Sequence, residues 1–144
     1  MSRKYDSGSS LQEKILKGVE LLADNVASTL GPRGRNVILH QKGYNPIVTK
    51  DGVTISKFVE LEDPFENAGA QIIKQVAAST AEECGDGTTT SIVLAQAVLR
   101  EAQKYVVAGS SPVEMKRGMD KAVAAIVERL EGLARPISSV EDIE

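Results

Sequence analysis

The stretch from Gly85 to Thr90 holds the densest set of polar groups that could do chemistry in the sequence. It reads Gly-Asp-Gly-Thr-Thr-Thr and stands where a helix is expected to begin. Glycine lets the backbone approach a ligand closely, and the unpaired N–H groups of a helix start favour phosphate. Asp86 would repel a bare phosphate, but Mg²⁺, which prefers oxygen ligands, would bridge the two. Taken alone, the hexapeptide is more typical of a plain turn with a threonine N-cap.

Two further loops carry glycine beside polar groups. Thr29–Pro32 ends a predicted helix, and Lys50–Gly52 follows a predicted strand. If the three loops converge, Asp86 would hold a metal, Thr88–Thr90 would bond phosphate oxygens, and Asp51 would orient a water. That arrangement suits phosphoryl transfer to water. The alternative for Thr29–Pro32 is a helix C-cap, and that for Lys50–Gly52 is an ordinary turn with a solvated ion pair. Neither a Walker A loop nor Gly-x-Gly-x-x-Gly after a strand is present.

The elements that must position these loops are mainly helical. Apolar residues at three- and four-residue spacing predict four long helices. We expect them to begin at a Ser10–Glu13 capping box, at Asp63-Pro64, near Thr89 and at Ser111-Pro112, and to end near Leu30, Glu83, Ala108 and Leu133.

A β-hairpin is predicted between the first two helices. Asn36–Lys50 contains two strand-like runs around a turn, and the alternating Val53–Phe58 predicts one more short strand. The expected fold class is therefore mainly α, with long packed helices and an inserted β-hairpin. Because an isolated hairpin is marginal in water, its edges should pair with another segment or a neighbouring molecule.

Composition narrows the possible functions. The chain has 144 residues, enough for one domain with a real core, and a net charge of −3 without a basic stripe. Nucleic acid is therefore a poor candidate partner, and no apolar run is long enough to span a membrane. Cys84 is the one cysteine, which favours a reducing compartment such as the cytoplasm; we expect it to be a small buried side chain. Met1–Ser10 lacks the apolar core of a secretory signal.

Several motifs, in this order, resemble the beginning of a group I chaperonin of the GroEL type. The resemblance rests on Thr29–Asn36, Thr49–Thr54, Leu61–Asn67, Gly85–Thr90 and Lys116–Ala122. Each piece is weak, but the set runs along nearly the whole chain with family-like spacing. Arg35-Asn36 after Gly-Pro-Arg-Gly resembles group I rather than the archaeal and eukaryotic-cytosolic group.

The resemblance implies an ATP-dependent protein-folding machine. Group I chaperonins form double rings, typically of seven subunits each, that act on unfolded proteins with a cochaperonin. By resemblance, residues 1–133 are the first part of the equatorial ATP-binding domain, and residues 134–144 begin the intermediate domain. The Asn36–Lys50 hairpin would reach a neighbouring subunit.

The resemblance also implies roles for individual residues with ATP, Mg²⁺ and a monovalent cation such as K⁺. Asp51 would help position the attacking water, and Asp86 would bind Mg²⁺. Lys50 would lie by the phosphates and the monovalent cation. The remaining expected nucleotide-binding residues are Thr29, Leu30, Gly31, Pro32, Gly87, Thr88, Thr89 and Thr90.

A full family member is several times longer, so this sequence resembles the phosphate-binding half of an ATP site. We expect it to bind Mg-nucleotide weakly, to have little turnover and not to fold substrates alone. The apolar Thr89–Ala108 helix would be buried in a complete domain, and here we expect exposed apolar surface and self-association. The alternative is a non-catalytic assembly module derived from a chaperonin. A stand-alone phosphohydrolase is a more distant possibility.

Overall fold

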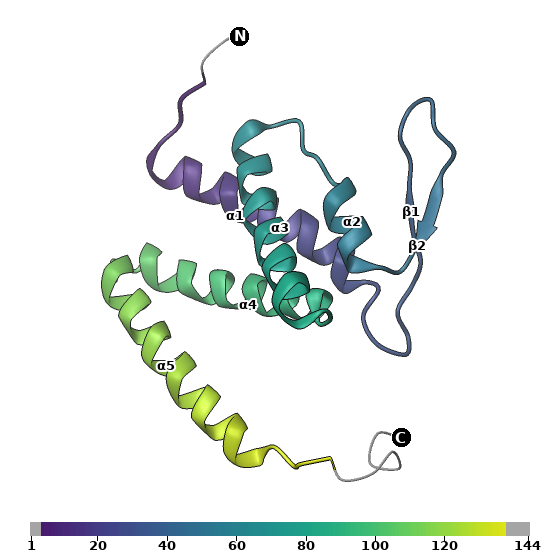
Figure 1. The fold of residues 1–144 in the computed structure, drawn as a ribbon. Coiled ribbons are helices and arrows are strands. Elements are labelled where there is room, and N and C mark those ends of the chain that lie inside the picture. The colour runs from purple at the N-terminus through teal and green to yellow at the C-terminus, as the bar shows by residue number, and fades with distance from the viewer. Residues whose placement is uncertain (1–3, 138–144) are drawn as a thin grey trace. The chain divides into compact units, whose positions relative to one another are not determined.

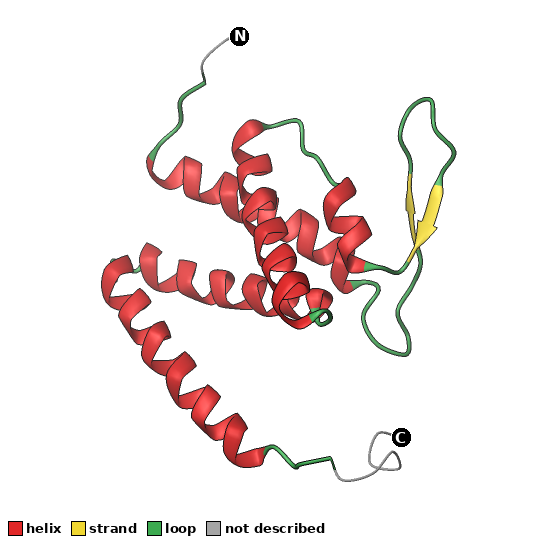
Figure 2. Cartoon of the chain, in the orientation of Figure 1, coloured by secondary structure: helices red, strands yellow, loops and turns green. Residues whose placement is uncertain are grey.

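The computed structural model describes residues 4–137, which contain five helices and one small antiparallel sheet (Figures 1 and 2). The helices are α1 (Gly8–Ala27), α2 (Gly52–Phe58), α3 (Pro64–Cys84), α4 (Thr88–Val107) and α5 (Pro112–Leu133), and the strands are β1 (Val37–Leu39) and β2 (Ile47–Thr49). This confirms the expected mainly helical class with an inserted hairpin. The chain divides into two units, one up to Glu101 and one from Ala102.

The first unit is built around the crossing of α1 and α3. Gly18 of α1 lies against the carbonyl oxygen of Glu66, and Gly69 of α3 lies against the carbonyl oxygen of Ile15. A side chain at either glycine would collide with backbone. Glycine inside the helical pattern at Gly69 suggests a close helix crossing from the sequence, and the structure shows one there.

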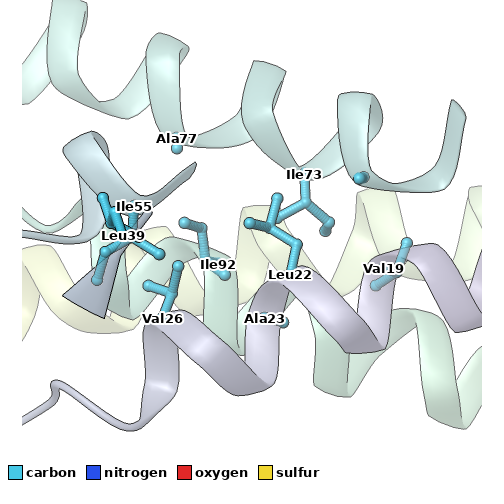
Figure 3. Close-up of a cluster of buried hydrophobic side chains, with 10 residues drawn as sticks. Val19, Leu22, Ala23, Val26, Leu39, Ile55, Ile73, Ala77 and Ile92 are labelled. Atoms are coloured by element: carbon cyan, nitrogen blue, oxygen red, sulfur yellow. The ribbon is translucent and has the colours of Figure 1, made fainter. Parts of the chain in front are cut away.

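One apolar core joins all the elements of this unit except β2. Figure 3 shows Leu22 of α1 facing Ile73 of α3, with Ile92 of α4 beside them and Val26 of α1 near Ile55 of α2. These side chains are fully buried. Because burying a side chain of this size stabilises by roughly 1.5–3 kcal/mol, the core holds α2 and α4 against α1 and α3.

The hairpin pairs β1 with β2 as predicted, with Val37 opposite Thr49 and Leu39 opposite Ile47. Leu39 is buried in the core, whereas Ile38 and Val48 are 69% and 60% exposed. The hairpin reaches away from the helices (Figure 2). Its apolar Ile38 and Val48 side chains therefore lie in solvent.

The strand predicted over Val53–Phe58 is wrong, because this segment forms α2. The Asp51 side chain accepts hydrogen bonds from the backbone N–H groups of Val53 and Thr54, which begins the helix. The buried positions Gly52, Ile55 and Ser56 follow helical spacing. In this short segment the apparent alternation and the helical pattern coincide, and the cap decides between them.

Two details of helix ends also differ from expectation. α1 begins at Gly8 rather than after Ser10, and the Ser10 hydroxyl donates to Asp6 instead of capping the helix. The helix then ends at Ala27 with Ser28 as its C-cap, a turn earlier than Gly31. In contrast, α3 begins as predicted, with Asp63 accepting from the N–H groups of Phe65 and Glu66.

The second unit consists of the end of α4 and the whole of α5. α5 runs from Pro112 to Leu133, close to the expected bounds, although the Ser111 side chain makes no capping hydrogen bond. The sequence also suggests an N-cap at Ser138 or Ser139 after the Arg135-Pro136 break, and these two serines lie outside the described residues. None of the described helices is long and apolar enough to cross a membrane.

Candidate functional site

The first turn of α2 brings the glycine-rich loops together. Gly52 has so little free space that a Cβ would collide with the Oγ1 of Thr89, the second residue of α4. The same Cβ would lie 3.1 Å from a methyl group of Val26, near the end of α1. The start of α2, the start of α4 and the end of α1 therefore meet at Gly52.

The Gly85–Thr90 loop presents backbone N–H groups at the start of α4. Gly85 and Gly87 have φ angles of 75° and 85°, which favour glycine. The first N–H of α4 that donates to a backbone carbonyl is that of Ser91, to the Gly87 carbonyl. Within the described chain, the N–H groups of Thr88, Thr89 and Thr90 have no acceptor. Such a helix start is electrostatically suited to an anion.

Asp86 is exposed and has a free carboxylate oxygen. Its Oδ1 accepts a 2.6 Å hydrogen bond from the Gly87 N–H, while Oδ2 contacts no donor among the described residues. No group of three His, Cys, Asp or Glu side chains that could enclose a metal occurs in residues 4–137. A single carboxylate fits Mg²⁺ nonetheless, because this ion keeps several waters and shares its other positions with substrate phosphates.

Asp51 is held as an anion at the start of α2. Its Oδ2 accepts hydrogen bonds from the hydroxyl and the N–H of Thr54, at 2.6 and 2.9 Å, and its Oδ1 accepts from the Val53 N–H. The Thr54 hydroxyl and then these N–H groups lower the pKa of Asp51 below 3.8, against the opposing effect of partial burial. Each carboxylate oxygen has two lone pairs, so Oδ1 can still accept a bond from water.

The Thr29–Pro32 loop leaves α1 in a fixed shape. Thr29 is 8% exposed, and its hydroxyl donates to the Val26 carbonyl at 2.7 Å. Gly31 has a φ of 75°, and Gly34 lies against the Thr29 carbonyl, so both positions require glycine. Leu30 is half exposed, which leaves its side chain accessible at the end of this loop.

Lys50 is the expected site residue that the structure fixes least. Its side chain is exposed and has no hydrogen bond or ion pair among the described residues. Its neighbours are ordered, since the Thr49 hydroxyl accepts from the Asp51 N–H at 3.0 Å. The structure therefore fixes the backbone on either side of Lys50 but gives its amine no partner.

The expectation for Cys84, which lies beside this site, is wrong. The sequence favoured a small buried thiol, but Cys84 is exposed on the last turn of α3. The last buried residue of α3 is Ala77, so the turn that carries Cys84 extends beyond the core.

Two polar side-chain interactions, called here the α1–α4 ties, join α1 to α4 and were not predicted from the sequence. The Gln96 amide, 8% exposed, donates to the Asp24 carboxylate at 2.8 Å, and Arg100 pairs with Glu20 at 3.0 Å. Gln96 in an otherwise apolar run was the available signal, because buried polar side chains need a partner.

A separate hollow of about 590 Å³ lies between β1 and the end of α2, and none of the three glycine loops lines it. It is lined by residues that include Ile38, His40, Phe58 and Glu60. Loop convergence, rather than the size of this hollow, marks the candidate site.

The geometry defines the class of protein: it is mainly helical, with an exposed hairpin and with three glycine loops gathered at helix ends. The family described as the TCP-1/cpn60 chaperonin family matches residues 22–144. This match covers most of the chain and includes all three loops. The chain therefore belongs to the TCP-1/cpn60 chaperonin family.

Proposed function

We propose that this chain provides the phosphate- and magnesium-binding part of the ATP site of a group I chaperonin. The observation that supports this most directly is the contact at Gly52, where the start of α2 meets Thr89 and Val26. Sequence spacing alone could not require the end of α1, the start of α2 and the start of α4, which are far apart in the chain, to meet. Family membership adds to this support, because chaperonins are protein-folding proteins.

In this proposal each loop has its own task. The N–H groups and hydroxyls of Thr88–Thr90, with Gly87, hold the phosphates, and Thr29–Pro32 lines the nucleotide. Asp86 holds Mg²⁺, which when bound would neutralise phosphate charge. Lys50 lies by the phosphates and a monovalent cation such as K⁺. Asp51 orients the attacking water through the carboxylate oxygen that retains accepting capacity.

The hairpin is proposed to serve assembly. Ile38 and Val48 are exposed on its faces, and neither strand has a second neighbour among the described residues. Such an edge accepts a further strand readily. We place the hairpin at a neighbouring subunit of a heptameric ring, which would act on unfolded proteins with a cochaperonin in the cytoplasm.

Isothermal titration calorimetry with Mg-ADP tests the nucleotide site. The unchanged protein should bind, weakly if it acts alone, and Asp86→Ala should weaken binding about tenfold or more, since a charged ligand contact contributes about 1.5–3 kcal/mol. Without Mg²⁺ the two proteins should bind ADP similarly, because Asp86 acts through the ion.

Glu83→Ala provides the matched control. Glu83 is an exposed acid on the last turn of α3 whose contact is with the Ser79 hydroxyl, so its loss should leave Mg-ADP binding unchanged. Absence of heat at millimolar Mg-ADP in the unchanged protein would remove the nucleotide site. Equal binding by Asp86→Ala would remove only the metal role.

A second candidate function is a non-catalytic assembly module. The exposed hairpin and the exposed side chains of α4 favour it, because apolar surface on separate elements suits docking onto other subunits. Light scattering with and without Mg-ADP separates the two functions. A defined oligomer that ignores nucleotide, in a protein that gives no binding heat, would favour the assembly module.

A further inference from the structure

The α1–α4 ties lie on one line along the two helices. Glu20 and Asp24 are four residues apart on α1, and Arg100 and Gln96 are four apart on α4, so each pair occupies one helix face. Glu20 bonds Arg100 and Asp24 bonds Gln96. Because the numbers rise on one helix as they fall on the other, α1 and this part of α4 run antiparallel.

This direction sends both helices toward the candidate site at the same end. From Asp24, α1 continues to the Thr29–Pro32 loop, and from Gln96, α4 runs back to Thr88. Eight residues of helix separate Gln96 from Thr88, a rise of about 12 Å. A slip of α4 along α1 by one residue would therefore move the threonines about 1.5 Å relative to the Thr29–Pro32 loop.

Apolar packing alone holds the position of α4 along its axis weakly. Up to Glu101, its fully buried apolar side chain is Ile92, and its other buried residues are Thr88 and Gln96. Apolar contact is not directional, whereas a hydrogen bond between two specific side chains fixes one register. Of the two ties, the Asp24–Gln96 bond has the more buried donor, because half of the Arg100 side chain is in solvent.

We propose that Asp24 and Gln96 are positioning residues for the nucleotide site. Their hydrogen bond sets the register of α4 against α1, and so places the Thr88–Thr90 N–H groups and the Thr29–Pro32 loop at the separation that one triphosphate requires. Glu20 and Arg100 reinforce the same register from a more exposed position. This inference rests on the proposed nucleotide site.

An exchange of the two side-chain types tests the proposal. Gln96→Glu places two carboxylates together, which breaks the bond and should weaken Mg-ADP binding about tenfold in calorimetry. Asp24→Asn combined with Gln96→Glu has one amide and one carboxylate again, with donor and acceptor exchanged. This double variant should restore binding to within about twofold of the unchanged protein, and its thermal midpoint should also recover.

Lys17→Met is the matched control. It removes an ion pair between α1 and Glu66 of α3, a tie between helices that does not involve α4. It should leave Mg-ADP binding unchanged. Binding losses of equal size in Lys17→Met and Gln96→Glu would mean that general loosening is responsible, and would overturn the positioning role.

The remaining outcomes separate this inference from the function beneath it. If the unchanged protein binds Mg-ADP and Gln96→Glu binds equally well, only the positioning role fails. If the exchanged pair folds but binds no better than Gln96→Glu alone, the hydrogen bond is not what matters, and the role fails as well. If the unchanged protein does not bind Mg-ADP, the proposed function itself fails.

Discussion

At the scale of single residues, three aspartates carry out the same local task at the start of three loops or helices. Asp51 and Asp63 each accept hydrogen bonds from two backbone N–H groups, and Asp86 accepts one from Gly87. Asp51 has donors on both carboxylate oxygens, whereas the described hydrogen bonds of Asp63 and Asp86 all reach Oδ1. Asp86 differs from Asp63 in its place, because it stands directly before the unpaired N–H groups at the start of α4. A metal ion on its second oxygen would therefore lie beside a site suited to phosphate.

The Asp51 cap predicts a specific dependence of stability on pH. Asp51→Ala should lower the free energy of unfolding by about 1 kcal/mol at neutral pH. Because the pKa of Asp51 is lowered in the folded state, this contribution is present above its unfolded value near 3.8 and is lost as pH falls through the lower folded value. Urea unfolding of both proteins between pH 7 and pH 2.5 should show the difference shrinking at the acid end.

Asp51→Asn is the control for this prediction. Asparagine caps helices about as well as aspartate but does not titrate. Its difference from the unchanged protein should be small at neutral pH and should fall further, or change sign, in acid. A constant deficit of Asp51→Ala across the whole pH range would show that the charge of the carboxylate does not contribute.

The sequence predicted the candidate residues better than it predicted their surroundings. The glycines, hydroxyls and carboxylates of the three loops could be picked out because their residue types limit what they can do. The role of Asp51 as the cap of α2 was missed, because Val53–Phe58 is too short for its period to be decided from the pattern alone. The Asp24–Gln96 bond joins residues 72 positions apart, and no local pattern reports such a distance.

At the scale of elements, the backbones of α1 and α3 lie in direct contact at two glycines, beside the apolar core that holds the first unit together. Gly18 and Gly69 stand in helix interiors, where glycine normally destabilises. Each lies against a carbonyl group of the facing helix, so the lack of a side chain permits the approach. The sequence indicated this at Gly69, because glycine inside a helical pattern needs a packing reason.

Gly69→Ala should therefore destabilise the protein in spite of the better helix propensity of alanine. The new Cβ would meet the Ile15 carbonyl, and backbone cannot move aside as a flexible side chain can. We expect a loss of about 1–3 kcal/mol in the free energy of unfolding, the usual cost of overpacking, measured by urea unfolding.

Gly118→Ala is the matched helical control. Nothing lies within 4 Å of the Cβ that it would add to α5. It should raise helicity by circular dichroism, since the propensity gain is about 0.5–1 kcal/mol. It should leave the urea transition of the first unit unchanged, because α5 belongs to the second unit. Equal stability of Gly69→Ala and the unchanged protein would mean that α1 and α3 can separate without cost.

At the scale of the whole molecule, more apolar surface is exposed than the length of the chain would require. A chain of 144 residues can bury a substantial core, yet Leu94, Val98 and Leu99 of α4 remain 60%, 49% and 38% exposed. The exposed apolar surface expected on this helix from the sequence is therefore present. A chaperonin family member that exposes a helix in this way is suited to association through it.

Leu94→Glu combined with Val98→Glu should reduce self-association of the protein. The two side chains are four residues apart on α4, so they share one exposed stripe. Charges there repel between copies, while the buried Ile92 on the opposite side keeps the helix in place. Light scattering over a range of concentrations should show smaller particles, and the thermal midpoint should stay nearly unchanged because exposed substitutions usually cost less than about 0.5 kcal/mol. Ile38→Glu, which places a charge on the exposed hairpin instead, should leave association through α4 intact; if it alone reduces particle size, the hairpin and not α4 is the self-associating surface.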